Sequence, residues 1–410
     1  MNLTKKEIQV VKDNLLIELF TEELPPDSLK ILSNQFGEII ASELISRNLV
    51  AKGDFQSYAT PRRIAVNIKS VLNEAEDEEK LIKLMPYSVG FDENNKPTQP
   101  LIKKLNSIDE AIKIEDLEIV EETNQKFIYV TKKLKGLKLE DSLSDIIKNA
   151  LQKLAIKKVM SYQLSDGWTS VNFVRPMRSL IVLHGTQVLN TTVLGCTSSN
   201  TTSGHRFESN KEIITIKHAD DYEKTLAMDG NVIACFNKRK SKIKEDIKVT
   251  LATLGKDFFI TDDEALTDEV TSLVEMPNIL VGHFEDKYLS IPEECLTLTM
   301  KTNQKYFPIF NKKIGLTNRF IIISNISPKN SDQVIHGNEK VIRPRLADAE
   351  FFYVEDKKLG LTTFCEKLKN VIYHHKLGSQ KDRAERVAKK LQYLTKNLNL
   401  KFNIDLEQLC

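Results

Sequence analysis

The sequence predicts an α+β protein, in which strands and helices mix up to about residue 340 and helices alone follow over 341–410. Short apolar stretches predict the strands: the run 15–21 is typical of a buried strand, and alternation over 64–71 is typical of a half-buried one. Apolar residues that recur every three or four positions behind Pro25 predict a helix, since proline favours the first helical turn. Only this helical spacing continues from Pro344 onward.

The remaining elements follow from the same two patterns. Further strands are expected over 171–174, 180–184, 188–194, 213–216, 232–236, 306–310 and 320–324, and a hairpin over 117–134 with its turn near 122–125. Helices are expected over 143–155, 219–228 and 262–275, and another should run on from Asn237, whose side chain would cap it. Segments 58–63, 86–100 and 197–204 are expected to be loops, and Ser379 with Asp382 resembles a capping box.

The chain of 410 residues is too long for one ordinary domain. We expect an α+β domain over 1–340, with a possible inserted subdomain over about 76–160, and the start of a helical domain over 341–410. Segment 406–409 reads as the beginning of a helix, so we expect the chain to be a truncated piece of a longer protein.

The composition is that of a soluble globular protein, because 41% of the residues are apolar and 28% are charged. With a net charge of +2, any binding of nucleic acid must come from local patches. Five scattered cysteines without a C-x-x-C pair argue against a disulfide framework or a structural zinc site, and favour a reducing, cytosolic setting. No signal peptide is evident, and no apolar run approaches the roughly 18 residues of a membrane span.

Two clusters of basic residues are candidates for binding phosphate. Arg62 and Arg63 follow a proline that fixes their loop, and paired guanidiniums can bind phosphate, although a turn with solvated arginines fits equally well. Lys238, Arg239 and Lys240 crowd the predicted start of a helix, where cations are unfavourable unless an anion binds. A solvated helix face is the alternative for this second cluster.

Ser203, His205 and Arg206 combine a possible nucleophile, a possible base and a cation. Serine and histidine two residues apart rarely align for catalysis, so a contact between Arg206 and an RNA backbone is the favoured interpretation. Glu22 and Glu23 could form an acid–base pair, but adjacent side chains tend to diverge, and favourable charge at a helix start is the simpler hypothesis.

Arg343 and Arg345 flank Pro344, where we expect a helix to begin after a polar loop. Cations are unfavourable at a helix N-terminus, so either carboxylates offset them or an anion binds there. Asp348 lies one turn from Arg345 and can pair with it. Arg343 has no such neighbour in sequence and remains the candidate for contact with an outside anion.

Motifs for nucleotide and metal chemistry are absent from the sequence. It contains neither a G-x-x-x-x-G-K-[ST] loop nor a G-x-G-x-x-G turn that opens a helix, so no ATP site is expected. His374, His375 and Asp382 lie near the predicted helical domain, but no His-Asp doublet occurs, and we expect no metal site. We assign no catalytic residue to this chain.

Seven strings of residues carry a family resemblance. They are Leu19–Pro26, Tyr58–Val66, Phe173–Arg178, Gly204–Phe207, Glu269–Glu275, Thr299–Pro308 and Gly337–Phe352. In this order they resemble the β subunit of the bacterial two-subunit glycyl-tRNA synthetases, over about residues 15–377. The chain departs from that family at 160–162, where an arginine and a tryptophan are usual, and at Ser179, where a tryptophan is usual.

The resemblance implies that this chain is an N-terminal fragment of that β subunit and is inactive by itself. In the family, the α subunit makes glycyl-adenylate with ATP and Mg²⁺, whereas the β subunit binds tRNA(Gly) and is needed for charging. The two form a cytoplasmic α2β2 tetramer, and the β chain needs no cofactor of its own. Hydrolytic editing of mischarged tRNA and a purely structural role in assembly are the alternatives.

The family also implies the fold of each part. The α+β part should resemble the editing-type domain of the phenylalanyl-tRNA synthetase β chain, and the helical part should begin an HD-like domain. The candidate tRNA-binding residues are Arg62, Arg63, Arg206, Lys238, Arg239, Lys240, Arg343 and Arg345.

Overall fold

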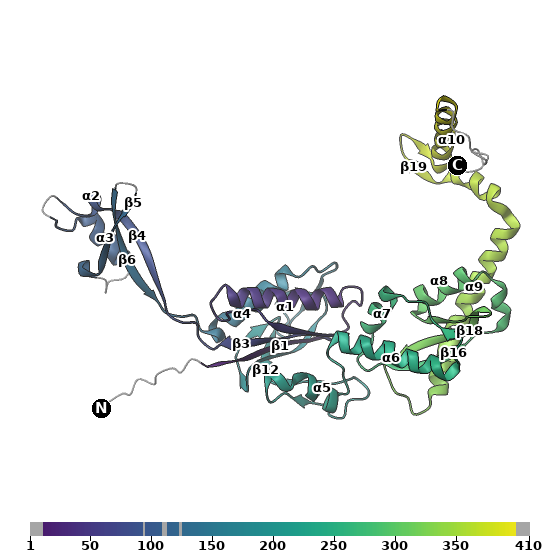
Figure 1. Cartoon of the computed structure of the whole chain (residues 1–410), viewed down its shortest axis with the longest axis horizontal. Helices are drawn as coiled ribbons and strands as arrows, with labels where there is room; N and C mark the ends of the chain where they lie inside the picture. The colour runs from purple at the N-terminus through teal and green to yellow at the C-terminus, as the bar shows by residue number, and fades with distance from the viewer. Residues whose placement is uncertain (1–10, 93–94, 109–112, 123–124, 399–410) are drawn as a thin grey trace. The chain divides into compact units, whose positions relative to one another are not determined.

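The computed structural model of the chain describes residues 11–92, 95–108, 113–122 and 125–398. It confirms the predicted α+β class, since several sheets and helices occur along the chain (Figure 1). Contacts within the chain define two units. Unit 1 comprises residues 1–245 and 267–278, and unit 2 comprises residues 246–266 and 279–410.

Unit 1 is built around a seven-stranded sheet with the spatial order β11-β12-β9-β1-β3-β2, in which β10 also pairs with β9. Its strands are β1 (Lys12–Thr21), β2 (Phe55–Thr60), β3 (Arg63–Leu72), β9 (Met177–His184), β10 (Gln187–Val188), β11 (Thr192–Val193) and β12 (Cys196–Ser199). β1 runs antiparallel to both β3 and β9. The predicted strands 15–21 and 64–71 are therefore confirmed as neighbours in one sheet. Residues 64–68 are buried at every position, so the expectation of a half-buried second strand is wrong there.

Helices cover both faces of this sheet. They are α1 (Leu29–Ile45), α4 (Leu139–Lys153) and α5 (Tyr222–Gly230). Figure 1 shows α1 and α5 on opposite sides of β1. Leu15 and Ile17 pack in a core with α1 and α4, whereas Leu16 packs in a second core with α5. Because β1 is buried on both faces, its sequence from Leu15 to Phe20 is apolar at every position except Glu18 and shows no alternation.

A separate three-stranded sheet lies in the segment between β3 and α4. Its strands β4 (Glu78–Pro86), β5 (Leu117–Glu122) and β6 (Gln125–Leu134) pair in the order β4-β6-β5. The hairpin predicted over 117–134 is confirmed as β5 and β6, but the loop expected over 86–100 contains α2 (Tyr87–Gly90) and the start of α3 (Gln99–Ile108). Leu101, Leu105 and Ile128 form the small core of this sheet.

Two of the predicted loops in unit 1 contain strands. β2 extends to Thr60, and the Ser/Thr-rich segment 197–204 forms the end of β12 and all of β13 (Thr201–Thr202). β13 pairs with β14 (Ile214–Thr215), while β7 (Met160–Gln163) pairs with β8 (Ser170–Phe173). Serine and threonine occur both in loops and in strands. Whether such a segment becomes a strand depends on a pairing partner that can lie far away in sequence.

Unit 2 contains a four-stranded sheet with the order β15-β17-β18-β16. Its strands are β15 (Phe258–Phe259), β16 (Asn278–His283), β17 (Phe307–Asn311) and β18 (Gly315–Ser324), and its helices include α8 (Glu293–Gln304). Two further helices, α6 (Phe236–Leu254) and α7 (Glu264–Thr271), each contain residues of both units. The strand expected over 232–236 does not form, because residues 232–235 have no regular structure and α6 begins at Phe236.

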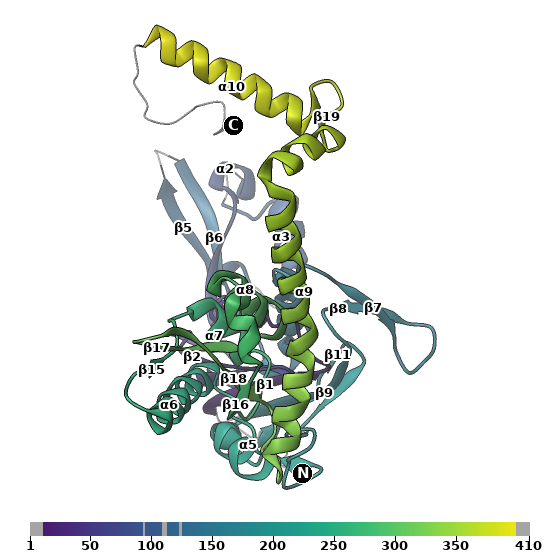
Figure 2. The same cartoon turned by 90° about the vertical axis from the view of Figure 1, so that its right-hand side faces the viewer.

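The helix expected to begin at Pro344 begins thirteen residues earlier. α9 spans Ser331–Lys367 (Figure 2). The Asn330 side chain caps it by accepting the backbone N–H of Asp332 at 3.0 Å. Pro344 thus lies inside α9, and the helical geometry is interrupted only at Gly360, with φ 70°. The sequence pattern was misleading because proline usually marks a helix start.

Residues beyond α9 are not wholly helical as expected. β19 (Ile372–His374) and β20 (Gly378–Ser379) form a small hairpin before α10 (Gln380–Asn397). The capping box is confirmed: Ser379 Oγ accepts the Asp382 N–H at 3.2 Å, and Asp382 Oδ2 accepts the Ser379 N–H at 2.7 Å. The helix start expected at 406–409 lies outside the described residues.

Candidate nucleic-acid interface

Arg63 lies at the centre of a buried ionic network in unit 1. Its Nη1 is 3.3 Å from Oε2 of Glu18, and its Nη2 is 3.5 Å from Oε1 of Glu275. Its Nη2 also donates to the backbone carbonyl of Ser203 at 2.9 Å. Tyr222 donates a short hydrogen bond to Glu18 from a second element. Because Arg63 is fully buried, it has no exposed surface to offer a phosphate.

The charges in this network stabilise each other. Burial alone would lower the pKa of Arg63, but the carboxylates of Glu18 and Glu275 outweigh that effect and raise it. Burial, aided by the charge of Glu18, raises the pKa of Tyr222 well above its usual value, so its hydroxyl remains a donor. The network therefore ties the end of β1 and the start of β3 to residues that follow β13 and α7.

Arg62 occupies the outer side of the same hairpin turn. Its guanidinium lies over the ring of Phe20, with 4.7 Å between Cζ and the ring centroid. Its Nε and Nη1 are buried and have no hydrogen-bond partner among the described residues. Burial lowers the pKa of Arg62, while Glu275 opposes this and the neighbouring Arg206 adds to it. An acceptor such as a phosphate oxygen would satisfy these donors.

Arg206 and Arg178 are held beside it by two glutamates. Nη2 of Arg206 is 3.2 Å from Oε2 of Glu22 and 3.0 Å from Oε1 of Glu23. Arg178 donates from Nε to Oε1 of Glu22 at 2.6 Å. The hydrogen bond from Arg178 lowers the pKa of Glu22, and the charges of Arg206 and Arg62 act in the same direction.

The helix-start hypothesis for Glu22 and Glu23 is therefore wrong. α1 begins at Leu29 and has no acidic residue in its first turn. Arg178 was not among the predicted candidates, although it ends one of the family strings. Met177 of β9 pairs with Thr21 of β1, and this pairing places Arg178 beside Glu22. The pairing of the two strands could not be predicted from the sequence.

Ser203 and His205 are not arranged as a catalytic pair. Nδ1 of His205 accepts the backbone N–H groups of Phe207 and Glu208, at 3.2 and 3.1 Å. The proton of a neutral ring must then be on Nε2, which is buried without a partner among the described residues. His205 is thus engaged in holding the turn that follows it.

The three consecutive cations at the start of α6 point to different partners. Lys238 is exposed and pairs with Glu223 at 2.9 Å, and Lys240 pairs with Asp268 at 2.5 Å. Arg239 is fully buried and donates to the backbone carbonyls of Thr271 at 3.0 Å and of Ala59 at 2.7 Å. Burial lowers the pKa of Arg239 to about 10, so it remains charged near neutral pH. No shared phosphate site is formed by these three residues.

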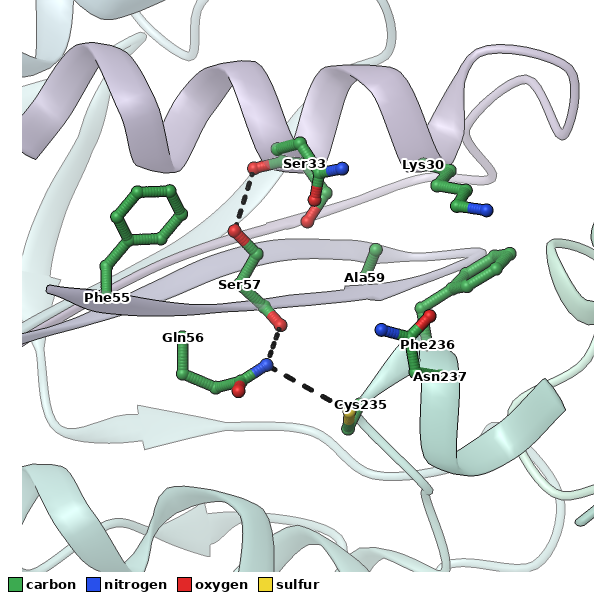
Figure 3. A pocket seen from close by; sticks show the side chains of 10 residues that line it. Lys30, Ser33, Phe55, Gln56, Ser57, Ala59, Cys235, Phe236 and Asn237 are labelled. Carbon is green, nitrogen blue, oxygen red and sulfur yellow. Dashed lines mark hydrogen bonds between the residues drawn. The ribbon is translucent and has the colours of Figure 1, made fainter. Parts of the chain in front are cut away.

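A pocket of about 210 Å³ lies between α1, β2 and the start of α6 (Figure 3). Its lining residues are Lys30, Ser33, Asn34, Phe55, Gln56, Ser57, Ala59, Cys235, Phe236 and Asn237. Ser57 Oγ donates to the carbonyl of Ser33 at 3.3 Å, and Gln56 Nε2 donates to the carbonyl of Ser57 at 2.8 Å. Lys30 pairs with Asp268. None of the predicted site residues lines this pocket.

Arg343 and Arg345 lie in unit 2, well inside α9. Nε of Arg343 is 2.5 Å from Oε1 of Glu285, a carboxylate far from it in sequence, so a residue of the chain itself pairs with this candidate for contact with an outside anion. Arg345 is exposed, and its expected pair with Asp348 is not formed in the described part of the chain. The helix-dipole argument does not apply to either residue, because the dipole acts within the first turn and α9 begins at Ser331.

Five of the seven family strings meet at one end of the unit 1 sheet. They contribute the end of β1, the β2–β3 turn, the start of β9, the turn after β13 and the end of α7. At the surface of this end lie the partly buried Arg62 and Glu22 and the exposed Arg178, Arg206 and Glu23. We call these five residues the arginine rim. The strings 299–308 and 337–352 belong to unit 2.

The described residues show neither a metal-binding cluster nor a membrane-spanning helix. The described residues contain no group of three His, Cys, Asp or Glu side chains that could hold a metal ion. Across that same part of the chain, no helix combines the length and apolar character needed to cross a membrane.

Comparison with known proteins gives one consistent family. The family model described as glycyl-tRNA synthetase beta subunit matches residues 15–409. The glycine–tRNA ligase beta subunit of Acidovorax sp. (strain JS42) is 45% identical over 377 residues, which are 91% of this chain and 52% of that protein. Its counterpart in Delftia acidovorans is 46% identical over 380 residues, 91% of this chain and 54% of that protein.

The glycine–tRNA ligase beta subunit of Nitrosomonas europaea is 44% identical over 377 residues, which are 92% of this chain and 52% of that protein. The chain thus spans about half the length of the curated relatives it matches.

Proposed function

Because the chain belongs to the glycyl-tRNA synthetase β-subunit family, we propose that it binds tRNA(Gly) and supports the attachment of glycine by a separate catalytic α subunit. The arginine rim is the observation that carries this proposal. It places three guanidiniums at one end of a sheet, and Arg62 among them has buried donors without an acceptor in the described residues. Guanidiniums bind phosphate through paired N–H donors, which is how proteins contact an RNA backbone.

Local charge rather than total charge supports RNA binding here. The net charge of the chain is only +2, so a diffuse electrostatic attraction would be weak. Six of the eight predicted candidates have side chains partly or fully open to solvent, namely Arg62, Arg206, Lys238, Lys240, Arg343 and Arg345. Arg63 and Arg239 are buried, and we propose that they hold the site in shape instead of contacting RNA.

We propose the same division of labour that the family resemblance implies. The chain contributes no ATP or Mg²⁺ site, the α subunit supplies the chemistry, and the full-length proteins assemble as a cytoplasmic α2β2 tetramer. Residues 1–340 would then correspond to an editing-type domain and residues 341–410 to the start of an HD-like domain. The arrangement of His205, whose Nδ1 is occupied by backbone N–H groups, gives no support to hydrolytic editing by Ser203 and His205.

The test is glycine charging and tRNA binding by α subunit mixed with this chain, with a full-length β subunit as the positive control. We expect the chain alone to bind tRNA at low salt and to show no charging activity. We expect it to associate with the α subunit as well. Absence of both tRNA binding and association would refute the proposal, and hydrolysis of mischarged tRNA that His205→Ala abolishes would favour editing instead.

A further inference from the structure

The turn that joins β13 to β14 presents an aromatic ring beside a cation. Phe207 is 77% exposed and directly follows Arg206, which is also exposed. A single exposed phenylalanine is not unusual on a protein surface. Phe207 differs because the backbone of its turn is fixed by several hydrogen bonds and by a close contact with another backbone segment.

His205 fixes this turn from the inside. Its ring is only 2% exposed and accepts the backbone N–H groups of Phe207 and Glu208. Its own backbone N–H donates to the carbonyl of Gly230 at 2.8 Å. A side chain at Gly204 would come within 2.5 Å of the Gly230 Cα, so the two backbones are in direct contact. The turn is therefore ordered before any partner arrives. Phe207 lies against it in a tilted ring contact with His205, 6.4 Å between the ring centroids, and most of the Phe207 side chain remains exposed.

The arginine rim provides phosphate ligands next to this ring. Arg206 is held by Glu22 and Glu23 in exposed ion pairs, which are weak and exchangeable in water. The charges of Arg62 and Arg206 repel each other, and this repulsion lowers the pKa of Arg62. Nε and Nη1 of Arg62 have no hydrogen-bond partner among the described residues. A phosphate at the rim could replace the glutamates on Arg206 and supply the acceptor that Arg62 lacks.

We propose that the turn 203–209 binds an unpaired nucleotide of RNA, with its base stacked on Phe207 and its phosphate bound by Arg206 and Arg62. Bases within a duplex are covered by their neighbours, whereas an unpaired base can stack on an exposed aromatic ring. The inference rests on the proposed tRNA binding and specifies the kind of RNA segment that this end of unit 1 recognises. It also explains why a rigid turn carries a phenylalanine in an exposed position.

The test compares binding of the whole chain to a labelled single-stranded RNA and to a blunt duplex of the same sequence, by fluorescence anisotropy. Phe207→Ala should weaken binding of the single strand about tenfold, since stacking on one base is worth that order of affinity. The same variant should leave duplex binding unchanged, and Phe207→Trp should retain single-strand binding. Trp168→Ala is the matched control, because Trp168 is a 90% exposed aromatic of unit 1 that belongs to the turn between β7 and β8 and not to the turn 203–209.

Each outcome separates this inference from the function on which it rests. If the unaltered chain binds no RNA, the proposed function fails. If it binds RNA and Phe207→Ala has no effect, only the present inference fails. Equal losses for single strand and duplex would also overturn it, as would a loss of α-subunit association with RNA binding intact. Unchanged thermal unfolding of Phe207→Ala would exclude misfolding as the cause of any loss.

Discussion

Individual arginines at one end of the unit 1 sheet differ sharply in their surroundings. Arg63 is fully enclosed with Glu18 and Glu275, whereas Arg206 pairs with Glu22 and Glu23 at the surface. A buried charge loses its hydration, so its partners are essential to its stability in that position. A surface pair remains hydrated and contributes little. Identical residue types therefore have different roles here.

Arg63→Met should lower the free energy of unfolding by about 3–5 kcal/mol, because it leaves the Glu18 and Glu275 carboxylates buried without a counter-charge. Arg206→Ala is the surface comparison and should cost less than about 1 kcal/mol. Urea-induced unfolding followed by circular dichroism measures both. Adding Glu18→Gln to Arg63→Met should restore part of the loss, and equal effects of the two arginine substitutions would contradict this account.

At the scale of elements, α1 and α4 are joined by one carboxylate. Glu43 of α1 accepts hydrogen bonds from Lys153 at 2.8 Å and Asn149 at 3.5 Å, both on α4, and from Arg47 at 2.5 Å. These donors, with Lys153 the strongest, lower the pKa of Glu43 from 4.5 to about 2. The same two helices share a core with β1, so the ion pairs lie beside an apolar contact.

This pKa predicts a specific acid sensitivity. The unfolded state binds the Glu43 proton near pH 4.5 and the folded state only near pH 2, so the stabilisation is complete above pH 4.5 and is lost as the pH falls towards 2. Glu43→Gln should therefore show a shallower loss of unfolding free energy between pH 4.5 and 2. An unchanged pH profile in this variant would rule out the assignment. Lys153→Met should raise the pKa of Glu43 in an NMR titration.

Pro344 is a second test at the scale of an element. A proline inside a helix lacks the N–H that would bond to the carbonyl four residues earlier, here that of Lys340, and costs about 3 kcal/mol. Pro344→Ala should raise the free energy of unfolding of the chain by about 1–3 kcal/mol, since part of the gain is offset by a more flexible unfolded state. Denaturant unfolding provides the measurement.

Gly337→Ala is the control for Pro344→Ala within the same helix. A methyl group added at Gly337 would meet no atom within 4 Å beyond the neighbouring helix backbone, so alanine fits there without a clash. Its gain should stay near 1 kcal/mol or below, as expected from helix propensity alone. A destabilised Pro344→Ala would mean that the proline makes contacts that alanine cannot replace.

At the scale of the whole molecule, a net charge of +2 restricts how the chain can attract RNA. If the three arginines of the rim contact phosphates, the logarithm of the binding constant for a single strand should fall with the logarithm of salt concentration with a slope near −2. Arg206→Ala should reduce the magnitude of this slope by roughly 0.7, since one phosphate contact is lost. Titrations at several salt concentrations give the slope.

The control for the salt experiment is Arg345→Ala in unit 2. Arg345 is exposed and lies outside the rim, so its removal should leave the slope unchanged if the rim is the binding surface. A slope that falls equally for Arg206→Ala and Arg345→Ala would indicate diffuse attraction. That result would exclude a localised site at the end of the unit 1 sheet.

Much of the fold was predictable because its signals are local. The apolar run of β1, the alternation of β3, the spacing in α1 and the capping box of α10 each lie within a few turns or residues of chain. Signals failed where a distant partner decided the outcome. Ser and Thr residues near 200 form strands instead of the predicted loop. Pro344 lies inside α9, whose Ile342 and Leu346 are buried in the unit 2 core.

For the candidate site, the family and the strings that carry Arg62, Arg178 and Arg206 can be recognised from the sequence alone. Which arginines are buried and which face solvent is evident only in the folded chain. The physical reason is that desolvation and pairing depend on residues far apart in the chain, as Glu18 and Glu275 are from Arg63. The spacing of residues along the chain therefore does not predict which arginines are buried. Helices and strands can be predicted from it, because their periods repeat over consecutive residues.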